Sequence, residues 1–99
     1  MDFEITRDGS SIAIAVSGKL NAETAPTLDD ALAIALQDFT DIVFDLEELE
    51  YISSAGLRTL LATYKHTLKA NGSMRIRNVD ENVMDVLEMS GFADLYVIE

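Results

Sequence analysis

The spacing of hydrophobic residues changes along the chain between a period of two and a period near 3.6. Alternation in residues 3–7 and 12–16 predicts two strands, which an Asp-Gly pair would join through a turn. Hydrophobic residues at helical spacing in residues 24–37 then predict a helix. The consecutive apolar residues in 41–46 are typical of a strand that is buried on both faces in the middle of a sheet.

The clearest predicted helix follows two consecutive serines in the middle of the chain. Its apolar positions recur at i, i+3, i+4, i+7 and i+11: Leu57, Leu60, Leu61, Tyr64 and Leu68. Asn71-Gly72 supplies the left-handed residue that commonly ends a helix. His66, the only histidine, falls between positions of this stripe, so we expect it to face solvent.

Capping residues indicate where the other two helices begin and end. For the first helix two alternatives stay open: Asn21 as its cap, or Pro26 at its first helical position. In the last third of the chain, Asp80 is a preferred N-cap for a short helix that Gly91 would end.

Two more strands complete the pattern. Residues 73–77 alternate Met74 and Ile76 with two arginines, and residues 95–98 form a last apolar run. The resulting order, β-β-α-β-α-β-α-β, predicts the α/β class. We expect a mixed, mostly parallel sheet of about five strands, with helices in right-handed crossovers.

Composition narrows the function classes. A chain of 99 residues that is 48% hydrophobic suits one domain, residues 1–99. It has no cysteine, and hence no disulfide or thiolate metal site, which favours a reducing compartment. We expect a cytoplasmic protein without membrane insertion, because no apolar run is long enough to cross a bilayer. The formal net charge of -11 disfavours nucleic acid and favours a basic protein surface as partner.

The segment that connects the central strand to the clearest helix carries the candidate chemistry. Ser53 and Ser54 lie where a hydroxyl can cap a helix, and capping alone is one interpretation. The other is a binding site, since partners and ligands of open α/β sheets usually bind at the carboxyl ends of the strands. Ala55 and Gly56 fit the second interpretation, because small residues let another surface approach the backbone.

Catalysis and metal binding have weaker support. His66 has no recognisable partners for a catalytic triad, so an enzyme with Ser54 as nucleophile ranks last. The acidic residues Glu47, Glu48 and Glu50 lack the ligand spacing of a calcium loop, and a solvated acidic rim is the expected reading. We therefore expect no catalytic residues, no metal site and no cofactor.

The stretch "DLEELEYISSAGLRTLL", residues 45–61, resembles the signature of STAS domains in bacterial anti-sigma factor antagonists. Two flanking stretches, "VSGKLNAETAPTL" at 16–28 and "NVMDVLEMSGF" at 82–92, resemble other parts of that family in order and spacing. The resemblance covers essentially the whole chain. It implies a single STAS domain whose strand and helix order is the one predicted above.

The resemblance also implies a function and a site. An unphosphorylated antagonist of this family binds a serine-kinase anti-sigma factor and frees a sigma factor; the kinase phosphorylates the antagonist, and a serine phosphatase resets it. The phosphoserine position of the family falls on Ser54, and its second hydroxyl residue falls on Ala55. Two aspartates of the family pattern fall on Ser53 and Asn21, which carry no charge. The implied partner-binding residues are Asn21, Ser53, Ser54, Ala55, Gly56 and Leu57.

A second interpretation keeps the fold and changes the role. STAS domains also act within lipid-transport and stress-sensing complexes, and a stand-alone module of that kind need not be controlled by phosphorylation of Ser54.

Overall fold

The computed structural model describes residues 1–91 and 97–98 of the chain. Six strands and three helices follow one another in these residues: β1 (Asp2–Asp8), β2 (Ser11–Leu20), α1 (Ala25–Ala35), β3 (Asp41–Asp45), β4 (Leu49–Ile52), α2 (Ser54–Lys69), β5 (Ser73–Arg77), α3 (Glu81–Met89) and β6 (Val97–Ile98). Of the predicted last strand, residues 95 and 96 lie outside the described residues, while 97 and 98 form β6.

The strands form one mixed sheet in the order β1-β2-β3-β5-β6, and β4 pairs with β2 off this path. The β1–β2 hairpin is antiparallel and every other pairing is parallel. Gly9 turns the hairpin with a φ of 63°, which an L side chain rarely adopts. The predicted α/β class and the mixed, mostly parallel sheet are confirmed.

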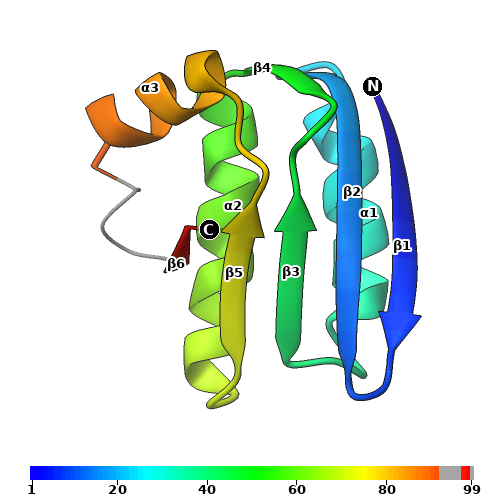
Figure 1. Cartoon of the computed structure of the whole chain (residues 1–99). Helices are drawn as coiled ribbons and strands as arrows, with labels where there is room; N and C mark the ends of the chain where they lie inside the picture. The colour runs from blue at the N-terminus through cyan, green and yellow to red at the C-terminus, as the bar shows by residue number, and fades with distance from the viewer. Residues whose placement is uncertain (92–96, 99) are drawn as a thin grey trace.

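Helices α1 and α2 lie side by side on one face of the sheet (Figure 1). The core between them and the strands is built from the alternating residues that the hydrophobic pattern predicts, with Ile14, Phe44 and Ile76 aligned across β2, β3 and β5. Residues 42–44 are all buried, as expected of a central strand. The core side chains of α1 are Ala25, Leu28 and Leu32.

Strand β4 is an element that the sequence pattern missed. The hydrophobic pattern indicates only a connecting segment between the central strand and the clearest helix, but Leu49–Ile52 within it pairs in parallel with the end of β2. In this strand Leu49 and Ile52 are buried, whereas the two residues between them are exposed. Such a pattern has no period of two, so alternation could not reveal the strand.

The buried face of α2 differs from the predicted stripe near the end of the helix. Leu68 is 57% exposed, and the residues that face inward on the last turns are Thr63 and Thr67. His66 is half-buried rather than solvent-facing, and its Nε2 donates to the carbonyl oxygen of Leu36 at 2.9 Å. Because Leu36 is the C-cap of α1, that helix ends level with His66 and leaves Leu68 uncovered.

Caps explain the remaining helix ends. Asp80 accepts a hydrogen bond from the backbone N–H of Val83 at 2.9 Å and so caps α3, as predicted. At the end of α2, Asn71 takes the left-handed conformation with a φ of 57°. The next residue, Gly72, lies so close to the backbone carbonyl of Thr40 that a side chain would not fit. No helix within residues 1–91 is both long and apolar enough to cross a membrane.

Candidate partner-binding site

The parallel pairing of β2 with β4 brings two separate sequence motifs together. Leu20 pairs with Ile52 at the carboxyl ends of these strands, and the N–H of Ser53 donates to the carbonyl of Leu20 at 2.9 Å. The chain leaves the two strands at Asn21 and Ser53, so these residues emerge next to each other. Two positions from different motifs therefore belong to one surface at the start of α2.

Ser53 is the N-cap of α2. Its backbone is extended, with φ -99° and ψ -178°, and its Oγ accepts a hydrogen bond from the N–H of Ala55 at 3.2 Å. The carbonyl of Ser53 accepts from the N–H of Leu57 at 2.9 Å. Capping therefore explains one of the two serines and leaves the other available.

The substitution Ser53→Ala is expected to lower the free energy of unfolding by about 0.5–2 kcal/mol, because it removes the capping oxygen. Urea denaturation measures this loss, and Ser54→Ala is the matched control, since Ser54 accepts no capping bond. An equal loss in the two variants would show that Ser53 is not the cap.

Ser54 is the first residue of α2 and is exposed. Among the hydrogen bonds of the described residues, none involves its hydroxyl group. The first turn of the helix carries no acidic residue. Arg58, one turn further on, is also exposed, and the i, i+4 spacing places it on the same side of the helix. An anionic group on Ser54 would thus meet the positive end of a helix and a nearby cation.

Asn21 organises the turn between β2 and α1. Its Oδ1 accepts hydrogen bonds from the N–H groups of Glu23 and Thr24 at 3.0 and 3.1 Å. The helix begins at Ala25, with Pro26 in its first turn, so Asn21 caps the turn before the helix rather than the helix itself. An aspartate could accept the same two bonds, and asparagine therefore keeps the turn while removing the charge.

The structure corrects the interpretation of Gly56. This residue is buried, and a Cβ added to it would lie 2.6 Å from Cγ1 of Ile52 and 2.9 Å from Cγ of Leu20. Glycine is thus needed so that α2 can pack on β2 and β4, and it does not open the backbone to a partner. Leu57 is only 8% exposed and belongs to the core.

The substitution Gly56→Ala is expected to lower the free energy of unfolding by about 1–3 kcal/mol, because overpacking against Ile52 and Leu20 outweighs the better helix propensity of alanine. Thermal and urea denaturation measure the change. A variant that is more stable but no longer binds its partner would instead show that Gly56 belongs to the binding surface.

The surroundings of Ser54 offer no histidine as a general base. His66 lies twelve residues further along α2, about 18 Å along the helix axis, and it is bonded to Leu36. Within residues 1–91 no three His, Cys, Asp or Glu side chains converge as a metal site would require.

The structure is that of a small α/β domain with an exposed serine at the N-terminus of α2. The sequence model of the STAS domain family matches residues 2–99. The chain belongs to the STAS domain family.

Two similar proteins are named as anti-sigma factor antagonists. A Bordetella bronchiseptica protein named as an anti-sigma factor antagonist, BtrV, is 34% identical over 92 residues, which cover 92% of this chain and 78% of that protein. The anti-sigma-B factor antagonist of Bacillus subtilis is 22% identical over 95 residues, covering 96% of this chain and 87% of the relative.

Solved structures agree on the fold. An anti-sigma factor antagonist from Thermotoga maritima superposes with a TM-score of 0.92 at 19% identity, covering 97% of this chain and 84% of that one. The phosphorylated form of SpoIIAA, a Bacillus cell fate determinant, superposes with a TM-score of 0.80 at 17% identity, covering 99% of this chain and 91% of that one.

Proposed function

We propose that this chain is an anti-sigma factor antagonist that is switched by phosphorylation of Ser54. Its unphosphorylated form binds a serine-kinase anti-sigma factor in the cytoplasm and thereby releases a sigma factor. One observation carries the proposal: Ser54 is exposed at the start of α2 and has no hydrogen bond among the described residues, while Ser53 supplies the cap. The names of the relatives support it.

The chemistry of the switch is a reversible phosphoryl transfer. The kinase transfers the γ-phosphoryl group of ATP to Oγ of Ser54, which gives up its proton, and ADP leaves. A serine phosphatase then hydrolyses the phosphoester with water, which restores the serine hydroxyl and releases inorganic phosphate. Since the hydroxyl has no role as a cap, both steps can proceed without breaking a hydrogen bond among the described residues.

The added phosphate acts mainly on the interface. It brings a charge of about -1.5 to -2 and three strong acceptors. At the N-terminus of α2 this charge meets a favourable helix dipole and the guanidinium of Arg58. The domain therefore keeps its structure, whereas a partner that covers Ser54 and Ala55 must desolvate a dianion. That cost is several kcal/mol unless the partner pairs the charge.

A phosphotransfer experiment with the natural partner tests the proposal. The tagged chain is recovered from its own cells with bound proteins, which are identified and then incubated with ATP. We expect a serine kinase that transfers phosphate to this chain, and we expect no transfer to the Ser54→Ala variant. Ser53→Ala is the control that keeps the acceptor.

Two outcomes would contradict the proposal. Phosphoryl transfer to Ser53 would show that the capping residue, and not Ser54, is the phosphorylation site. Recovery of a transport ATPase and permease instead of a kinase would favour a STAS module of a lipid-transport complex. The uncharged Asn21 and Ser53, which occupy two acidic positions of the family pattern, give this second function its support.

A further inference from the structure

The face of the sheet that looks away from α1 and α2 is uncovered by the described helices (Figure 1). Its side chains alternate with those of the core, and the strand register aligns Glu4, Ala15, Asp45 and Arg77 across β1, β2, β3 and β5. Ala15 is exposed although it lies on an interior strand of the sheet. Because the side chains of β2 on this face are small, they leave a shallow depression in the middle of the face.

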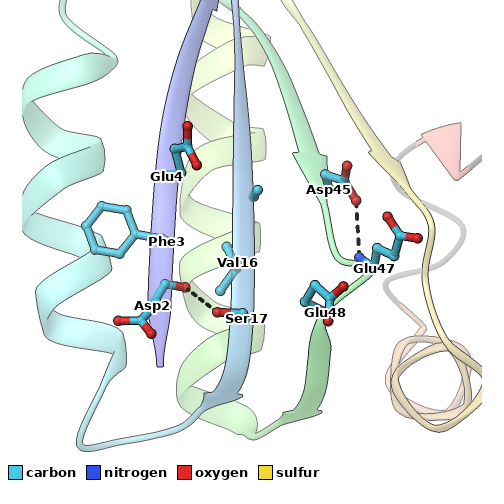
Figure 2. Close-up of a pocket in the computed structure, with 9 residues that line it drawn as sticks. Asp2, Phe3, Glu4, Val16, Ser17, Asp45, Glu47 and Glu48 are labelled. Atoms are coloured by element: carbon cyan, nitrogen blue, oxygen red, sulfur yellow. Dashed lines mark hydrogen bonds between the residues drawn. The ribbon is translucent and has the colours of Figure 1, made fainter.

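A groove of about 340 Å³ lies over the amino end of β1 and the carboxyl ends of β2 and β3. Ala15 and Ser17 of β2 line its floor, between β1 and the segment that follows β3. Figure 2 shows carboxylates on both sides of β2. They come from the two ends of the groove: Asp2 and Glu4 on β1, and Asp45, Glu47 and Glu48 around the end of β3.

Most of these carboxylates lack a basic partner. Asp45 is the exception, because its Oδ1 accepts hydrogen bonds from the N–H of Glu47 and from Asn78, and its Oδ2 lies 4.0 Å from Nε of Arg77. No salt bridge within the described residues neutralises the other four. The carboxylates do not converge as metal ligands. They are instead spread along the groove, so a ligand that pairs with all of them must carry several separate cationic groups.

We propose that this groove docks an extended segment of a partner protein that carries several Lys or Arg side chains separated by small residues. The low floor formed by Ala15 and Ser17 lets the backbone of such a segment approach the sheet, and the carboxylates on both sides pair with its cations. A second copy of this chain is a poor occupant, because each copy has a formal net charge of -11. Ala15 and Ser17 alternate along β2 with the core residues, so the groove lies on the opposite face of the sheet from α2, and the proposal does not rest on the switch at Ser54.

Nuclear magnetic resonance with a synthetic Arg-Ser-Arg-Ser-Arg peptide as probe tests this docking surface. We expect saturable shifts of the backbone amides of Glu4, Ala15 and Glu48 in the labelled full chain. The double variant Glu4→Lys/Glu48→Lys should bind the peptide about tenfold more weakly. Asp45 is left unchanged, because its hydrogen bonds support the loop.

The matched control is Asp30→Lys/Asp38→Lys, which changes the net charge equally at exposed positions in and just after α1. We expect this variant to retain the affinity of the unmodified chain. An equal loss of peptide affinity in both double variants would overturn the proposal, because it would show diffuse charge attraction. Amide shifts that map outside the groove would overturn it for the same reason. Equally tight binding of spermine would overturn it in favour of a small-cation site. If the lysine variant fails to fold, Glu4→Gln/Glu48→Gln supplies the same comparison with a smaller expected loss.

Discussion

The substitution Phe44→Ala is expected to lower the free energy of unfolding by about 3–5 kcal/mol, the largest stability loss that we predict. Phe44 is 0% exposed in β3, where it lies between Ile14 of β2 and Ile76 of β5. Removing the ring takes away its burial and leaves a cavity between the sheet and the helices. The free energy of unfolding of natural domains is only about 5–15 kcal/mol, so this loss is a large fraction of the total stability.

Urea denaturation of Phe44→Ala measures the loss, and Ile34→Ala is the control. Ile34 is 70% exposed on α1, so its truncation should change the free energy of unfolding by less than about 0.5 kcal/mol. If Phe44→Ala fails to fold, Phe44→Leu, which keeps most of the apolar volume, should fold with a smaller loss. A change below about 1 kcal/mol for Phe44→Ala would contradict the position of the core.

The substitution Ser54→Asp is expected to weaken binding of the anti-sigma factor by about a hundredfold or more while leaving the melting temperature nearly unchanged. A carboxylate at the first position of α2 is favoured by the helix dipole by about 0.3–1 kcal/mol, so the domain should not lose stability. A partner that covers Ser54 must desolvate the new charge, and each 1.4 kcal/mol of that cost is about tenfold in affinity.

Calorimetric titration with the recovered kinase measures the affinity, and Ser10→Asp is the matched control. Ser10 is exposed in the β1–β2 turn, at the opposite end of the sheet from the start of α2, and the substitution adds the same charge (Figure 1). We expect Ser10→Asp to bind like the unmodified chain. A large drop in the stability of Ser54→Asp would instead mean that Ser54 is a structural residue.

The periodic parts of the fold could be predicted from the sequence because each buries one regular face. The hairpin, α1, β3, β5 and the caps at Asp80 and Gly91 all follow from local spacing or local chemistry. Strand β4 could not be predicted, since its two exposed central residues break the alternation. Leu68 falls on the predicted apolar stripe and is nevertheless exposed, because periodicity reports the faces of a helix but not where the neighbouring helix ends.

The site was predictable as a set of residues but not as a geometry. The sequence identifies two serines, and only the structure assigns the cap to Ser53 and leaves Ser54 exposed. The proximity of Asn21 depends on the pairing of β2 with β4, which the sequence pattern missed. The interpretation of Gly56 was wrong because a glycine in a sequence does not reveal whether backbone or side chains crowd it.

Phosphopeptide and intact-mass analysis of the chain isolated from its own cells, grown under favourable and stressed conditions, tests the phosphorylation switch most directly. We predict phosphate on Ser54 alone, at an occupancy that changes between the two conditions. An unmodified Ser54 under every condition would contradict the switch and leave a STAS domain that binds its partner constitutively.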